Sequence, residues 1–202
     1  MESKQASRMD RKKEETQNKI ITAAVALFHQ YGLEAVTMEQ IALAADIAKG
    51  TLYHYFPFKE AILNAYLQRS FRERNPERLE QIRGLPDTRA RLEHIFALLI
   101  EGVQRQKEIF EAFLVYRMKQ VLSLCPVEPE SRSGIAVLIR EILALGRQGG
   151  ELRTDLPAEV LEGLFEYALI ASVKPFYQQP EQFDARKAAQ QAADLFLNGA
   201  KV

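Results

Sequence analysis

The chain has 202 residues, of which 47% are hydrophobic and 27% are charged, a composition typical of a globular protein with one large or two small domains. Its 27 basic and 27 acidic residues balance, which argues against a general polyanion binder and leaves phosphate contact to local basic clusters. The one cysteine, Cys125, excludes an intrachain disulfide, and no apolar run reaches the length of a membrane span. We therefore expect a cytoplasmic protein that makes no membrane contact.

The N-terminal part of the chain predicts a long helix followed by a capped short one. After a mobile stretch over residues 1–10, apolar residues at helical spacing predict a helix over residues 11–31. Gly32 follows as a natural C-cap. Thr37 and Gln40, three residues apart, have the spacing of a capping box at the start of the second helix.

Residues 37–60 predict two short helices with a tight turn between them and the start of a further helix. Asp46 falls in the turn, where a left-handed backbone is expected and Asp is tolerated better than most residues. Ile47 and Leu52 supply apolar contacts that hold the second short helix against the first. The polar and aromatic side chains over residues 49–55 are left on a projecting surface, which suits contact with phosphates and base edges.

The rest of the chain is expected to be helical, because no stretch shows the period-two alternation of a strand. The expected helices span residues 59–82, 87–106, 107–124, 130–148, 158–174 and 184–198. The far half of the first of these is charged and thinly apolar, as in a connector between two modules. Pro76 is expected to kink or break it, and Pro175 to end the helix that begins near residue 158. The predicted fold class is therefore all-α, with about nine helices.

The segment over residues 37–60 closely resembles the DNA-binding helix-turn-helix of the TetR family of bacterial transcriptional regulators. The specific part of the resemblance is the run KGTLYHYF, followed shortly by Lys59 and Glu60. Two positions depart from the family pattern, since Asp46 stands where Gly is common and Phe58 where a short polar cap is more frequent. Outside residues 20–67 the resemblance extends only to the layout of the helices.

The resemblance implies a helix-turn-helix domain over residues 1–58 and a helical effector-binding and dimerisation domain over residues 59–202. It places the DNA contacts on Thr37, Lys49, Gly50, Thr51, Tyr53, His54, Tyr55 and Lys59. Phe56 is expected to pack inside the first domain, while Tyr55 is open to either role. The basic cluster over residues 11–13 is either an arm for the minor groove or a solvated charge run.

The resemblance also implies a small-molecule effector within the second domain, mostly apolar and with or without one acidic group. The large side chains there are either core or pocket lining. The pocket interpretation names Phe96, Leu99, Val103, Phe110, Phe113, Tyr116, Arg117, Leu138, Ile142, Phe165 and Leu169. Arg117 is either an anion-binding group or a structurally paired residue.

A two-fold homodimer through a four-helix face is a further implication. The predicted interface consists of Leu161, Leu164, Phe165, Ala168, Ser172, Ala188, Ala192, Leu195 and Phe196. The alternative is that these stripes are buried within the monomer. Two recognition helices about one helical turn of DNA apart match a palindromic operator.

Nothing in the sequence indicates catalysis or a cofactor. The three histidines lie far apart, and Cys125 has no neighbouring His or second cysteine at CxxC spacing. The hypothesis is therefore a homodimeric repressor of a palindromic operator in double-stranded DNA, released by a small molecule. Its alternatives are an activator, a DNA-binding protein without an effector, and a helical enzyme that retains a helix-turn-helix.

Overall fold

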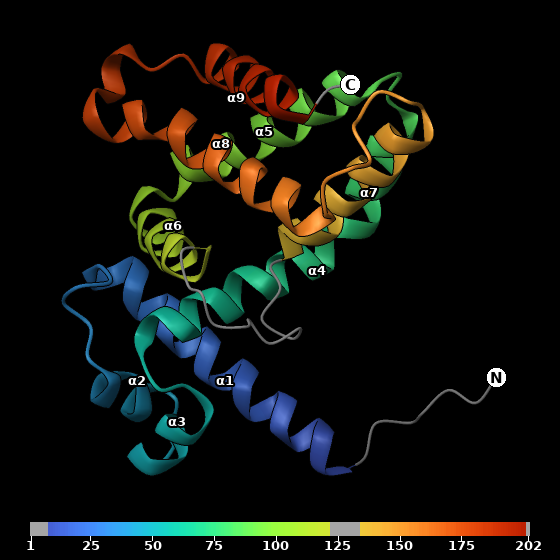
Figure 1. The fold of residues 1–202 in the computed structure, drawn as a ribbon. Coiled ribbons are helices and arrows are strands. Elements are labelled where there is room, and N and C mark those ends of the chain that lie inside the picture. The colour runs from blue at the N-terminus through green and yellow to red at the C-terminus, as the bar shows by residue number, and fades with distance from the viewer. Residues whose placement is uncertain (1–7, 122–133, 201–202) are drawn as a thin grey trace. The chain divides into compact units, whose positions relative to one another are not determined.

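The computed structural model describes residues 8–121 and 134–200, without the side chains of residues 8, 10, 117 and 119–121. In this part of the chain all regular elements are helices, nine α-helices and one short 3-10 helix, as the sequence predicted (Figure 1). Cys125 and residues 1–7, for which we stated expectations from the sequence, lie outside the described part of the chain. The chain divides into two compact units, unit 1 over residues 1–67 and unit 2 over residues 68–202.

Unit 1 contains α1 (Arg8–Tyr31), α2 (Met38–Ala44), α3 (Lys49–Tyr55) and the first part of α4 (Lys59–Gly84). Its core draws apolar side chains from all four helices, among them Ile20, Phe28, Ile41, Leu52 and Ile62. The division between the units falls inside α4, whereas the sequence had suggested the start of that helix.

Gly32 ends α1 in the way that the sequence predicted. Its φ of 79° lies in the left-handed region, which glycine adopts without a Cβ penalty. Its N–H donates to the Phe28 carbonyl at 2.9 Å, which satisfies one of the last carbonyls of the helix.

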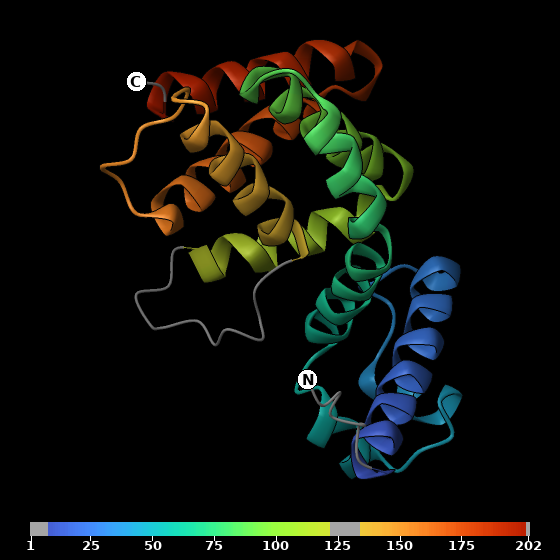
Figure 2. The ribbon, with the colours of Figure 1, turned by 90° about the vertical axis from the view of Figure 1, so that its right-hand side faces the viewer.

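Unit 2 contains the remainder of α4 and all later helices, which are arranged in a layered bundle (Figure 2). These are α5 (Thr88–Arg105), α6 (Lys107–Val121), α7 (Gly134–Gln148), α8 (Ala158–Gln178), the 3-10 helix Pro180–Gln182 and α9 (Ala185–Ala200). The last helix packs along both α5 and α8 (Figure 1). At the centre, the Phe96 ring stacks on Phe165 with 4.3 Å between centroids, and Phe165 meets Phe196 edge-on.

The prolines have weaker effects than the sequence suggested. Pro76 lies inside α4, which is not broken, and α8 continues through Pro175 to Gln178, so the prediction that Pro175 ends this helix was wrong. A proline removes one helical hydrogen bond and crowds the preceding turn. Both prolines are exposed, and only three further residues of α8 follow Pro175.

None of the helices in residues 8–121 and 134–200 is both long enough and apolar enough to cross a bilayer. Within the same residues, no group of three or more His, Cys, Asp or Glu side chains is arranged to hold a metal ion.

Candidate nucleic-acid interface

The start of α2 is fixed by the predicted capping box. The Thr37 hydroxyl accepts a hydrogen bond from the Gln40 backbone N–H at 3.2 Å, and the Thr37 N–H donates to Gln40 Oε1 at 2.8 Å. These two bonds satisfy donors that helix geometry would otherwise leave unpaired. They also occupy the Thr37 N–H that the sequence assigned to a DNA phosphate.

The turn between α2 and α3 has the left-handed residue that the sequence placed there. Asp46 has a φ of 49°, and the following N–H, of Ile47, donates to the Ala42 carbonyl at 3.1 Å. Lys19 of α1 reaches this turn, with its ammonium 3.4 Å from the Asp46 carbonyl oxygen and 3.5 Å from its carboxylate. Sequence reasoning missed this contact, because the two residues lie 27 positions apart.

One face of α3 is anchored in the core and the other is exposed. Leu52 is completely buried and Phe56 is also buried, which confirms the predicted packing role of Phe56. Elsewhere on the helix Tyr53 is 41% exposed, and Lys49 and His54 are exposed as well. This short helix therefore presents a surface that is both polar and aromatic.

Thr51 and Tyr55 are half-buried at the edges of this exposed surface, and Gly50 lies within it. A Cβ added to Gly50 would meet no atom within 4 Å. Because a helical glycine is less stable than alanine by roughly 0.5–1 kcal/mol, and the chain leaves room for a side chain here, packing within the protein does not explain this glycine.

The electrostatics of the surface centre on Lys49. Its ammonium forms an ion pair with Glu39 of α2 and lies 5.8 Å from the centroid of the Tyr53 ring. The hydrogen bond from Lys49 lowers the pKa of the Glu39 carboxyl, and the same bond raises the pKa of Lys49. Both side chains are exposed, so salt screens the pair and a DNA phosphate can compete for the ammonium.

Lys59 has a different environment. Only 20% of its side chain is exposed, and its ammonium donates to the Leu33 carbonyl at 2.7 Å and to the Glu34 carbonyl at 3.3 Å. These bonds tie the start of α4 to the turn after α1. Two of the three ammonium donors are thus already used, which leaves one for the phosphate contact that the sequence suggested.

The residues predicted to line an effector pocket come from α5 to α8. Most are buried, namely Phe96, Leu99, Val103, Phe110, Phe113, Leu138, Ile142, Phe165 and Leu169. Tyr116 is half-buried, and the side chain of Arg117 lies outside the described residues. Phe110 and Phe113 meet edge-on at 6.2 Å, and the Phe110 ring packs against Gly102 of α5, where an added Cβ would lie 3.2 Å away.

The residues predicted to form a dimer interface divide into two groups. Six are buried within the single chain, namely Leu161, Phe165, Ala168, Ala188, Ala192 and Phe196. For these six, the interpretation of a stripe buried in the monomer holds. Leu164 and Ser172 are half-buried and Leu195 is exposed. The predicted interface did not include Val160 and Tyr167, two exposed apolar residues of α8. They lie one heptad apart on the outer face of this helix.

Comparison with known proteins agrees with the geometry of unit 1. Residues 20–66 match the profile of the family described as bacterial regulatory proteins, tetR family. Residues 20–66 thus contain the segment that defines this family. The matched residues contain the capping box, the turn and the whole of α3.

Two curated proteins that are named as transcriptional repressors are similar to this chain. The HTH-type transcriptional repressor KstR of Rhodococcus jostii (strain RHA1) is 37% identical over 101 residues, which cover 48% of this chain and 45% of that protein. The chain thus matches less than half the length of that curated relative. KstR2 of Mycolicibacterium smegmatis is 25% identical over 187 residues, covering 90% of this chain and 89% of that protein.

A solved structure extends the fold similarity over nearly the whole chain. The FadR repressor of Thermus thermophilus, a tetR-family protein in complex with lauroyl-CoA, superposes with a TM-score of 0.67 and 26% identity. The match covers 92% of this chain and 95% of that one.

Proposed function

We propose that this protein is a DNA-binding transcriptional repressor whose affinity for its operator falls when unit 2 binds a small amphipathic effector. The observation that carries the proposal is the orientation of α3. Leu52 and Phe56 are held in the core of unit 1, while the side chains of Lys49, Tyr53 and His54 are exposed. Relatives named as repressors favour repression over activation or catalysis.

In this proposal the exposed face of α3 enters the major groove. A recognition helix meets base edges mainly through its N-terminal residues, which here are Lys49, Gly50 and Thr51. Glycine at position 50 lets the DNA approach the helix backbone closely, which accounts for a residue that the chain's own packing does not require. Lys49 exchanges Glu39 for a phosphate, so binding should weaken steeply with salt.

The basic cluster over residues 11–13 has a smaller part in this scheme. All three side chains are exposed, and Arg11 already lies 3.7 Å from Glu15 one turn along α1. This local pairing favours a solvated charge run over an arm that enters the minor groove.

The short length of the recognition helix α3 favours a homodimer. Helix α3 has seven residues, so a single copy reads few bases, whereas two copies related by a two-fold axis read a palindrome. Exposed apolar residues on α8 and α9, namely Val160, Tyr167 and Leu195, offer a surface for the second copy. A stable interface buries about 1,200–2,000 Å² in total.

We infer that the effector is an amphiphile with an extended apolar part. The buried aromatic and aliphatic side chains of α5 to α8 suit such a part, and the similar repressor of Thermus thermophilus binds lauroyl-CoA. Release requires only that the effector binds the form with low DNA affinity more tightly, with a coupling of typically 1–3 kcal/mol. Helix α4 belongs to both units and is the covalent path for that coupling.

Selection from random DNA duplexes tests this function. The protein should enrich one palindrome with half-sites about one helical turn apart, and fluorescence anisotropy should show release of that duplex when lauroyl-CoA or a related amphiphile saturates the protein. Recovery of no preferred sequence would refute the DNA-binding function. A selected palindrome whose affinity no amphiphile changes would refute only the effector.

A further inference from the structure

The inward face of α4 in unit 2 is unusually polar for a packed helix. Residues 68, 71, 75, 78 and 82 recur at three- and four-residue steps and therefore share one face. Phe71 and Ile82 are buried there, as expected for a core-facing stripe. The other three positions hold Gln68, Asn75 and Arg78, and Asn75 is only 6% exposed.

The side-chain amides of Gln68 and Asn75 both hydrogen-bond to the backbone of the same glycine at the start of α7. The Gly134 N–H donates to Gln68 Oε1, and Asn75 Nδ2 donates to the Gly134 carbonyl at 2.9 Å. A Cβ on Gly134 would lie 2.2 Å from Phe71 Cβ, so only glycine allows α7 to approach α4 this closely. The amides are thus held in fixed orientations.

Each amide uses only one of its ends in these bonds. The Gln68 Nε2 and Asn75 Oδ1 atoms are buried and have no hydrogen-bond partner among the described residues. One is a donor and the other an acceptor. Buried groups of this kind are rare in native proteins because leaving them unpaired costs free energy, and a ligand is one explanation for them.

Arg78 adds to the same face a cation that forms no hydrogen bond or ion pair with the described residues. It is half-buried, and its guanidinium carbon lies 5.1 Å from the centroid of the Phe71 ring. No described carboxylate forms an ion pair with it. Burial and the like charge of Arg74 lower its pKa, and Glu77 offsets this only in part.

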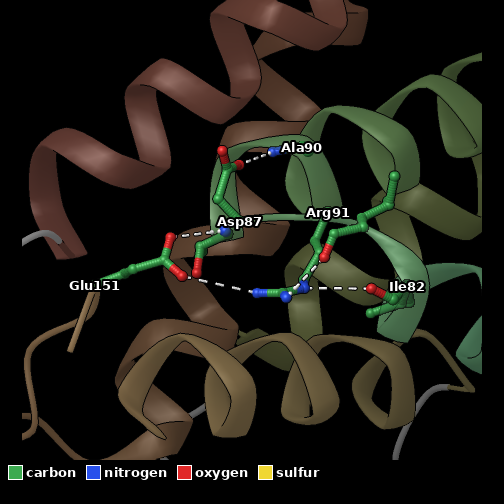
Figure 3. A network of polar contacts seen from close by, with 7 residues as sticks. Ile82, Asp87, Ala90, Arg91 and Glu151 are labelled. Atoms are coloured by element: carbon green, nitrogen blue, oxygen red, sulfur yellow. Dashed lines mark hydrogen bonds and ion pairs between the residues drawn. The ribbon is translucent and has the colours of Figure 1, made fainter. Parts of the chain in front are cut away.

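The contrast with Arg91 of α5 shows what a purely structural arginine looks like in this unit (Figure 3). Arg91 donates to the Ile82 carbonyl at 3.2 Å and to the Leu85 carbonyl at 2.8 Å, and it lies 3.8 Å from the Glu151 carboxylate. The protein itself therefore supplies hydrogen-bond acceptors and an ion-pair partner for the Arg91 guanidinium. Arg78 lies less than two helical turns before Ile82 and Leu85, which supply these carbonyls. Among the described residues it has no comparable hydrogen-bond acceptors.

We propose that Gln68, Asn75 and Arg78 bind the anionic head of the amphipathic effector. The guanidinium pairs with a carboxylate or phosphate oxygen, a geometry that Arg favours. The free Gln68 N–H donates to a second oxygen, and the Asn75 carbonyl accepts from a hydroxyl or amide N–H of the ligand. Phe71 supports the guanidinium and contacts the first apolar atoms. This inference rests on the proposed function, since it names the class of effector.

Calorimetric titration of the full-length protein with three probes tests the site. Laurate carries a carboxylate, lauroyl-CoA carries phosphates, and 1-dodecanol has an apolar chain without charge. The wild type should bind at least one anionic probe more tightly than 1-dodecanol. Arg78→Met should weaken that binding by about 10- to 100-fold, as expected for a lost charge-assisted bond, and leave 1-dodecanol unchanged. Comparison of the affinities for laurate and lauroyl-CoA shows whether the site binds a carboxylate head or a phosphate head.

Arg72→Met is the matched control, because it removes the same charge from an exposed position of α4 that does not share a face with Arg78. It should bind every probe as the wild type does. Thermal unfolding without ligand separates a binding role from a structural one. Arg78→Met should keep or raise the melting temperature, since it removes an unpaired cation, whereas a structural Arg78 predicts a lower one.

Three results would overturn the site: unchanged affinity of Arg78→Met for the anionic probes, equal affinity of the wild type for 1-dodecanol, or no binding of either anionic probe. The titrations contain no DNA, so any of these can coexist with a selected palindrome. Failure of the site is therefore distinguishable from failure of the DNA-binding function.

Discussion

The two units bury different kinds of side chain. Among the described residues of unit 1, every buried side chain is apolar, and its polar contacts lie at or near the surface. Unit 2 buries Asn75, Thr88 and Arg91 and half-buries Arg78. Unit 1 holds one buried polar atom without a described partner, Asn64 Oδ1, whereas unit 2 buries several polar side chains whose partners must come from distant parts of the chain or from a ligand.

The largest expected effect concerns the core of unit 2. Phe165→Ala should lower the free energy of unfolding by about 3–5 kcal/mol, because it removes a fully buried ring and leaves a cavity. Lys174→Ala, at an exposed position of the same helix, should leave unfolding nearly unchanged. Urea denaturation followed by circular dichroism, at one fixed protein concentration because of the proposed dimer, measures both. Equal losses would show that α8 faces the core differently.

The local parts of the fold were predictable, and the long-range parts were not. Gly32, the capping box and the left-handed Asp46 depend on residues within a few positions of one another, so sequence rules suffice. The Lys19 contact with the turn depends on folding, which brings together residues 27 positions apart.

Prediction failed in unit 2 where tertiary packing decides the outcome. Both faces of α8 carry apolar residues, and the packing of α5, α7 and α9 against this helix determines which face is the core. The far half of α4 resembled a charged connector, yet one of its faces packs on Gly134. The spacing of Phe71 and Ile82 was the one signal in the sequence that this half of the helix has an inward side.

Arg78 and Arg91 allow a second comparison, between an arginine with protein partners and one without them among the described residues. Arg91→Met should lower the free energy of unfolding by about 1.5–3 kcal/mol, because it removes charge-assisted hydrogen bonds to the Ile82 and Leu85 carbonyls. Arg78→Met should cause no loss. Urea denaturation of both variants under identical conditions measures the difference. If the two substitutions destabilised the protein equally, Arg78 would be a structural residue.

A smaller effect is expected at the start of α2. Thr37→Ala removes the acceptor for the Gln40 N–H and should cost about 0.5–2 kcal/mol of stability. Gln40→Ala removes the acceptor for the Thr37 N–H and hydroxyl but keeps the hydroxyl that caps α2, and it should cost less. Thermal unfolding of the two variants ranks them, and a Thr37→Ala protein as stable as the wild type would mean that the cap does not support α2 in solution.

The smallest expected effect is a pH dependence at Asp155. Its carboxylate accepts hydrogen bonds from Arg153 at 2.7 and 2.6 Å, which lowers its pKa from 3.8 to about 2. A carboxyl whose pKa is depressed in the folded state stabilises the protein above its unfolded pKa, and this contribution disappears as the pH falls from about 4 to 2.

Asp155→Asn should therefore remove a small part of the acid sensitivity of unfolding in that range. The pair is exposed, so high salt should reduce the difference between the two proteins. An identical acid profile for variant and wild type at low salt would show that the ion pair is not formed in solution.

The most direct test of the outward-facing α3 is the affinity of two tyrosine variants for a selected palindromic duplex. Tyr53 is an exposed residue of α3, 41% accessible, and Tyr31 is an exposed tyrosine at the end of α1, 57% accessible. In fluorescence anisotropy titrations, Tyr53→Ala should weaken binding by at least about 10-fold, while Tyr31→Ala binds as the wild type does. Wild-type affinity for Tyr53→Ala, or equal losses in both variants, would contradict the placement of α3 in the DNA groove.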